Sequence, residues 1–103
     1  MYIAMNRFRV KKDRTADFEE MWRSRDSYLH EVEGFKSFAL LKGPQQDDYI
    51  LYASHTVWES QAHFVGWTQS EAFRKAHSHA GKTAEPATIG PPQFEGFEAV
   101  LTA

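Results

Sequence analysis

Residues 35–58 read FKSFALLKGPQQDDYILYASHTVW, and this stretch decides the fold. Its two ends, residues 35–42 and 49–58, contain the β-branched, aromatic and long apolar side chains that favour strands. The link between them, Gly43-Pro44-Gln45-Gln46-Asp47-Asp48, is short and polar and is built from residues that form turns. The stretch therefore predicts a β-hairpin in the middle of the chain.

A strand and a helix are expected before the hairpin. Residues 2–10 mix β-branched, aromatic and long apolar side chains without Gly or Pro, which predicts a strand. A helix is predicted from Thr15 to about Glu31, followed by Gly34 as its stop signal. Its apolar stripe repeats every three or four residues, at Phe18, Trp22, Arg25, Leu29 and Val32.

Two helices and a strand are expected after the hairpin. Residues 59–66 predict a short helix with Ala62, Phe64 and Val65 inward, and Ser70 is placed to cap a second helix. Residues 94–101 predict the last strand. The order β-α-β-β-α-β is the ferredoxin-like α+β plan, in which helices cover one face of a four-stranded antiparallel sheet.

The strand at residues 49–58 is apolar at both alternating sets of positions. Helices on one side would leave its second face in water, which is unfavourable for so many apolar side chains. A second copy of the sheet would cover that face. We therefore expect a homodimer.

Composition narrows the class of protein. The 103 residues suit a single domain, 1–103, and a net charge of −2 gives no general attraction for nucleic acid. The chain has no cysteine, no signal peptide pattern and no segment of 18 apolar residues. We expect a cytoplasmic protein without a nucleic-acid or membrane partner. Residues 80–92, with two Gly and three Pro, are expected to form a mobile loop.

His77 is the first candidate for chemistry. It lies four residues after Phe73, one helical turn, so its imidazole is on or beside the apolar face of the last helix. The other histidines have no spacing that places them with it, which gives little support to a histidine zinc site. Two interpretations of His77 are possible: an exposed histidine near a helix C-terminus, or a metal ligand that faces the core.

Three further residues each have two possible roles, one structural and one in ligand binding. Asn6 lies inside a predicted strand, where a buried amide needs a partner: neighbouring backbone, or a ligand in a pocket. Trp67 is either an ordinary core aromatic or the wall of a site. Arg25 lies on an apolar helix stripe, so its guanidinium either extends to solvent or binds a ligand carboxylate. No nucleophile elbow or phosphate-binding glycine loop is present.

Several motifs together resemble the Isd-type haem-degrading monooxygenases of the antibiotic-biosynthesis-monooxygenase superfamily. The resemblance covers nearly the whole chain and continues at the C-terminal end, which is similar to the mycobacterial haem-degrading branch. The motifs that carry it are Asn6-Arg7, Glu33-Gly34-Phe35, Thr56-Val57-Trp58-Glu59-Ser60, Phe64-x-x-Trp67-x-x-Ser70-x-x-Phe73-x-x-Ala76-His77, and Pro86-Ala87-Thr88-Ile89-Gly90 leading into Phe97-Glu98-Ala99-Val100-Leu101.

The resemblance implies a dimeric α+β barrel in which each subunit holds haem, both cofactor and substrate, between its helices and its sheet. His77 matches the axial ligand of the haem iron. Asn6 matches the residue that donates a hydrogen bond beside the iron, where oxygen binds, and Trp67 matches the aromatic that presses the porphyrin out of plane. All three are therefore expected to be catalytic.

The resemblance also implies a set of haem-binding residues: Trp22, Arg25, Phe73 and His77. Trp22 stands where phenylalanine is common in the family. Because ring distortion is tied to the carbon that is attacked, the resemblance leaves open whether that carbon leaves as CO or as formaldehyde.

The expected function is that of a haem-degrading monooxygenase. It would use O2 and electrons from an external donor, such as a reductase, to release iron and a bilin-like product. Two alternatives remain at this stage: a cofactor-free monooxygenase acting on quinol or anthrone-like aromatics, and a haem carrier without enzymatic activity. The same fold can host different functions, so the site has to distinguish them.

Overall fold

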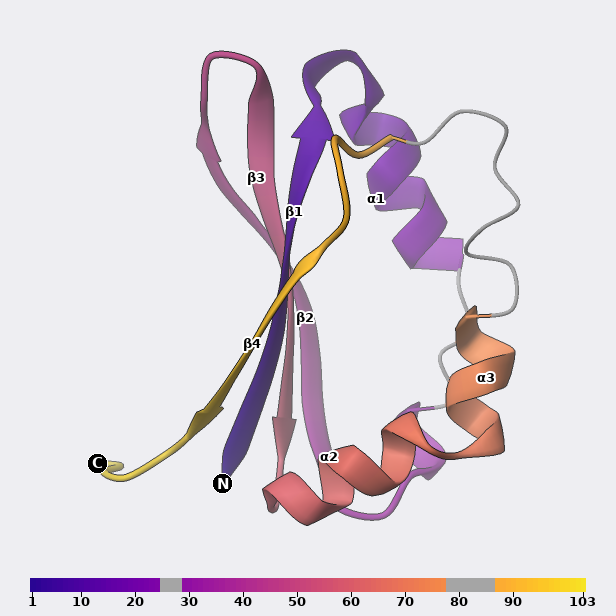
Figure 1. Ribbon diagram of the computed structural model, residues 1–103, viewed down its shortest axis with the longest axis vertical. Coiled ribbons are helices and arrows are strands. Elements are labelled where there is room, and N and C mark those ends of the chain that lie inside the picture. Colours follow the sequence, from indigo (N-terminus) through magenta and orange to yellow (C-terminus); the bar gives the residue numbers. More distant parts are fainter. Residues whose placement is uncertain (25–28, 78–86) are drawn as a thin grey trace.

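The computed structural model describes residues 1–24, 29–77 and 87–103, with the side chains of Ala72, Ala76 and His77 excepted. One four-stranded sheet, strand order β2-β3-β1-β4, carries the helices on one side (Figure 1). All three strand pairings are antiparallel. The predicted ferredoxin-like α+β fold is confirmed. Its elements are β1 (Tyr2–Lys11), α1 (Thr15–Ser24), β2 (Phe35–Gln45), β3 (Tyr49–Trp58), α2 (Gln61–Thr68), α3 (Glu71–His77) and β4 (Gln93–Glu98).

The predicted hairpin is confirmed as β2 and β3, and β3 has the predicted bounds. β2 is longer than predicted because its pairing continues, through an irregularity between Lys42 and Gln45, into the segment expected to turn. The two helices predicted after the hairpin are present as α2 and α3. Ser60 caps α2, accepting a hydrogen bond from the backbone N–H of His63 at 3.3 Å.

Three predicted details are wrong. Regular helix does not reach Glu31: α1 is described over Thr15–Ser24, and Leu29–Glu31 form a 3-10 turn in which Leu29 is buried. Ala62 and Val65 are exposed because α2 turns Phe64 and Trp67 toward the sheet. β4 ends at Glu98, not Leu101; Glu98 pairs with Tyr2, the first residue of β1.

The core consists of two separate clusters on the side of the sheet that bears the helices. Figure 1 shows α1 and α2 over opposite ends of the sheet; Trp67 of α2 belongs to the first cluster, and Phe18 of α1 belongs to the second. The first cluster contains Tyr2, Ala4, Leu29, Trp58 and Trp67. The second cluster contains Val10, Phe18 and Tyr52, with Phe8 and Trp22 packed against it.

The segment expected to form a mobile loop is described only from Ala87 onward; residues 78–86 lie outside the described part. Ala87 accepts a backbone hydrogen bond from Lys11 at 2.9 Å, and Ile89 donates one to Arg9 at 2.7 Å. These bonds hold residues 87–89 against the end of β1. In the described residues, no helix is both long and apolar enough to cross a membrane.

Candidate functional site

Asn6 lies at the middle of the sheet, on the face that the helices cover. Side chains alternate along a strand, and the buried Tyr2, Ala4 and Val10 share the parity of Asn6 on β1. Asn6 pairs with Ser54 of β3 and with Phe94 of β4, so these side chains form one row across the sheet. The row lies between the two core clusters.

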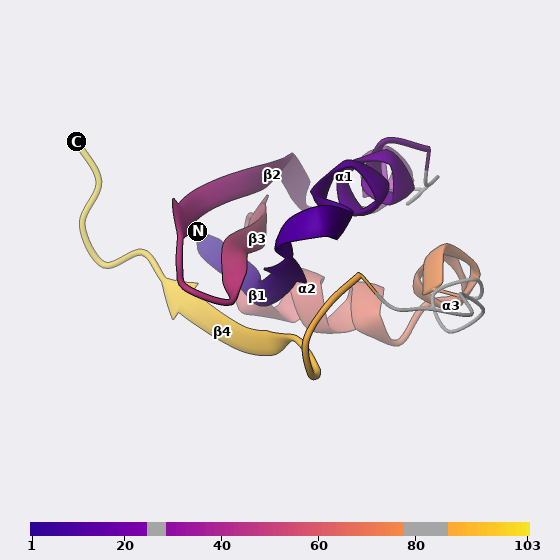
Figure 2. The same ribbon diagram turned by 90° about the horizontal axis from the view of Figure 1, so that it is seen from above.

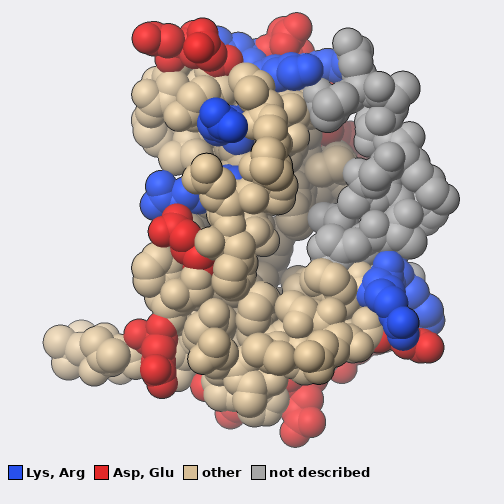
Figure 3. All heavy atoms as spheres, in the orientation of Figure 1, with Lys and Arg blue, Asp and Glu red and all other residues tan. Residues whose placement is uncertain are grey.

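The row is more polar than the clusters on either side of it. Ser54 is buried, and Asn6 is half-buried. The Asn6 side chain makes no hydrogen bond with any residue that the structure describes. A half-buried amide that makes no such bond is available to a ligand on the helical side of the sheet. In the space-filling view, a hollow opens beside the middle of the sheet (Figure 3).

Trp67 is held in the first cluster by other aromatic rings. Its ring centroid lies 5.7 Å from that of Trp58 and 4.8 Å from that of Phe73, which is nearly perpendicular to it. With 9% of its surface exposed, Trp67 is a core residue of the fold. It also lines a cavity of about 410 Å³ beside Val32 and Gly66.

α3 carries the residue expected to bind iron. Ser70 begins the helix by accepting a hydrogen bond from the backbone N–H of Phe73 at 3.1 Å, and Phe73 fixes the helix against Trp67. His77 is the last residue of α3, which stands apart from the sheet on its helical side (Figure 1). The direction of its imidazole is not described, and Arg25 lies outside the described residues.

Trp22 belongs to the opposite cluster from Trp67. It is half-buried and contacts Phe8 and Phe18 edge-on, with centroid distances of 5.9 and 6.4 Å. Phe8 is two residues from Asn6 on the same face of β1. The structure therefore brings Asn6 between an aromatic group that contains Trp22 and another that contains Trp67 and Phe73.

A profile of the family described as "Antibiotic biosynthesis monooxygenase" matches residues 1–79. The chain belongs to this family. It is 31% identical over 83 residues to a staphylobilin-producing haem oxygenase from Staphylococcus saprophyticus, a match that covers 81% of this chain and 79% of the relative.

Two solved structures superimpose on nearly the whole chain. MhuD, a haem degrader from Mycobacterium tuberculosis solved with two haems in its active site, is 27% identical with a TM-score of 0.67, covering 100% of this chain and 99% of MhuD. SnoaB, a cofactor-independent oxygenase from Streptomyces nogalater, has a TM-score of 0.69 and 20% identity, and the match covers 98% of this chain and 94% of SnoaB. The likeness to SnoaB shows the shared fold alone.

Two features of this antibiotic-biosynthesis-monooxygenase domain were missed from the sequence. The position of Ser54 beside Asn6 depends on the register between β1 and β3, which cannot be predicted from local sequence. The buried Tyr52 hydroxyl donates a hydrogen bond to the Glu19 carboxylate, joining β3 to α1. Burial first, and then this bond and the Glu19 charge, raise the pKa of Tyr52 to about 12. The alternation of β3 could have indicated that Tyr52 faces inward.

Among the described residues, no group of three or more His, Cys, Asp or Glu side chains is placed to hold a metal ion directly.

Proposed function

We propose that this chain is a haem-degrading monooxygenase. One observation carries the proposal: the Asn6 amide, without a hydrogen bond among the described residues, faces the helical side between two aromatic clusters. The haem oxygenase and MhuD relatives, at 31% and 27% identity, support haem as the substrate.

The arrangement fits haem in shape and polarity. A porphyrin is a wide apolar disc with a polar centre, and here two aromatic clusters flank a strip formed by Asn6 and Ser54. Trp22 would contact the ring from the α1 side, and Trp67 and Phe73 from the α2–α3 side. His77, at the end of α3, would supply the axial nitrogen. Arg25 would pair with a haem carboxylate.

Bound haem would supply the iron that activates O2 and the ring that is cleaved, with electrons from an external donor. The residues of the chain supply position and polarity. The Asn6 amide would offer N–H donors to an oxygen species that carries negative charge. Trp67, packed against Trp58 and Phe73, would press on one side of the ring. Iron and a bilin-like chromophore are the proposed products.

A haem titration tests the proposal. Wild-type protein should give the Soret band of histidine-ligated haem, which bleaches under O2 with ascorbate or a reductase. Mass spectrometry should then identify an opened tetrapyrrole. His77→Ala should lose the ligation spectrum, whereas His30→Ala, at an exposed histidine outside the cleft, should keep it.

Two outcomes would contradict haem degradation. Stoichiometric haem uptake without turnover in reduced protein would indicate a carrier. Oxygenation of phenolic aromatics by His77→Ala, together with haem binding no better than to an unrelated protein, would indicate a cofactor-free monooxygenase.

We also propose that the active form is a homodimer built on the open face of the sheet. Leu41, Leu51, Val57 and Phe97 share this face, and Leu41 and Phe97 are 42% and 48% exposed. A second copy would remove this apolar surface from water.

A further inference from the structure

A second cavity, of about 340 Å³, lies between α1 and the β2 edge of the sheet. Its volume is at the lower end of the range of small-molecule sites, about 300–1,000 Å³. The cavity adjoins the Asn6 row: Leu40, which pairs with Ser54, lines it, and Trp22 contacts both Phe8 and Phe38. Nothing in the proposed haem reaction uses the remaining side chains of this cavity.

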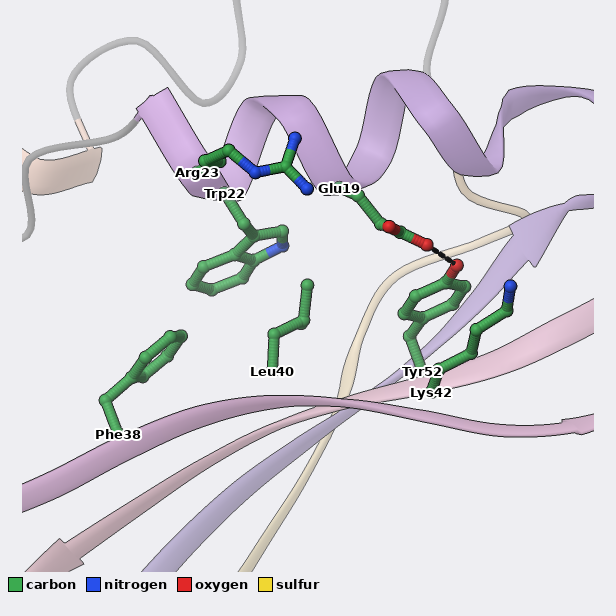
Figure 4. A pocket seen from close by; sticks show the side chains of 7 residues that line it. All are labelled: Glu19, Trp22, Arg23, Phe38, Leu40, Lys42 and Tyr52. Atoms are coloured by element: carbon green, nitrogen blue, oxygen red, sulfur yellow. Dashed lines mark hydrogen bonds between the residues drawn. The ribbon is translucent and has the colours of Figure 1, made fainter.

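One end of the cavity is aromatic. Trp22 and Phe38 are stacked with their centroids 5.6 Å apart and their planes at 23°, and Leu40 lies between this end and the other (Figure 4). Phe38 is 41% exposed, although it lies on the helical face of the sheet. This end has the surface that an aromatic ring of a ligand would cover.

The other end carries two opposite charges that do not neutralise each other. Glu19, Tyr52 and Lys42 gather there (Figure 4). Glu19 is fixed, because its Oε2 accepts the hydrogen bond of the buried Tyr52 hydroxyl, and no described side chain donates to its Oε1. Lys42 forms no ion pair with any described residue. Arg23, at the rim, is already paired with Glu20 at 2.7 Å.

We propose that this cavity binds a free aromatic α-amino acid. The ring would pack on Trp22 and Phe38, the ammonium group would donate to Glu19 Oε1, and the carboxylate would accept from Lys42. The Glu19 carboxylate can bind a positive group and the Lys42 ammonium can bind a negative one. A zwitterion carries both groups, whereas a simple cation or anion would use only one of the two side chains. The cavity shares Trp22 with the proposed haem site, but Glu19 and Lys42 at its polar end have no part in the proposed haem reaction.

Three probes that differ in one charged group test the site on the full chain without haem. L-Phenylalanine carries both groups, phenethylamine lacks the carboxylate, and 3-phenylpropionate lacks the ammonium. Calorimetry should show L-phenylalanine binding at least about tenfold more tightly than either analogue, since a charge-assisted hydrogen bond is worth about one factor of ten or more.

Matched variants assign each charge. Glu19→Gln, which keeps an acceptor for Tyr52, should abolish the preference for L-phenylalanine over 3-phenylpropionate. Lys42→Gln should abolish the preference over phenethylamine. Glu59→Gln after β3 and Lys36→Gln on β2, both at exposed positions outside the cavity, should change neither. Equal affinity for all three probes, or preferences unaltered by Glu19→Gln and Lys42→Gln in folded protein, would overturn the proposal. The haem titration is unaffected by either result.

Discussion

At the scale of single residues, Asn6 is the least expected side chain of the sheet. Its strand neighbours on the same face, Ala4 and Phe8, are apolar, and asparagine is a poor strand former. The sequence indicated that something must compensate this amide. Only the register showed that its row lies between two aromatic clusters rather than inside one of them.

Asn6→Ala should separate haem binding from haem turnover. The variant should bind haem within a few-fold of wild type, because the aromatic walls remain. Turnover should fall roughly a hundredfold, as for the loss of one donor that stabilises developing charge. Soret titration and single-turnover bleaching measure the two quantities. Ser37→Ala, at an exposed position of β2, is the control, and unchanged turnover in Asn6→Ala would remove Asn6 from the reaction.

Tyr52 makes folding sensitive to alkaline pH. Its pKa is about 12 in the folded protein against 10.0 ordinarily, so the neutral phenol is the form that folding favours. The resulting stability is complete below pH 10 and is lost as the pH rises from 10 to 12, by up to about 3 kcal/mol. Urea unfolding at pH 9 and at pH 11.5 should show a smaller alkaline loss in Tyr52→Phe than in wild type. An equal loss in both proteins would contradict the assignment.

At the scale of elements, α3 depends on one cap and one aromatic contact. It has seven residues, too few to be stable alone, and Ser70 and Phe73 tie it to α2. Local sequence predicted this helix because the cap and the apolar spacing are both local signals. The 3-10 turn at Leu29–Glu31 and the end of β4 opposite Tyr2 were not predicted, because burial of Leu29 in a core cluster and the pairing of β4 with β1 are tertiary features.

Ser70→Ala should weaken haem binding more than it weakens the fold. Loss of the cap should cost the helix about 1 kcal/mol, which loosens the segment that carries His77. We expect haem affinity to fall several-fold while the thermal midpoint changes by only a few degrees. Ser24→Ala, at the exposed end of α1, provides the comparison. If both variants bind haem equally well, α3 does not position the ligand.

At the scale of the whole molecule, the two faces of the sheet differ in what covers them. The helices occupy one face, and Figure 2 shows the other without a helix. Leu41→Glu on the open face should shift the protein from dimer to monomer in analytical ultracentrifugation. Val65→Glu on α2, at a side chain with nearly the same exposure (40% against 42%), should leave the dimer intact. A wild-type monomer at micromolar concentration would contradict the proposed dimer.

The sequence by itself determined the order of elements, the hairpin, the cap of α3 and the membership of the family, because periodicity, turn residues and motifs are properties of neighbouring positions. It also singled out Asn6, Trp67 and His77 one at a time. Only the tertiary structure decided that Asn6 shares a row with Ser54, that Trp22 and Trp67 belong to opposite clusters, and that Glu19 meets Tyr52. These relations join residues distant in the chain, and they depend on strand register and on how each helix packs, which no local pattern specifies.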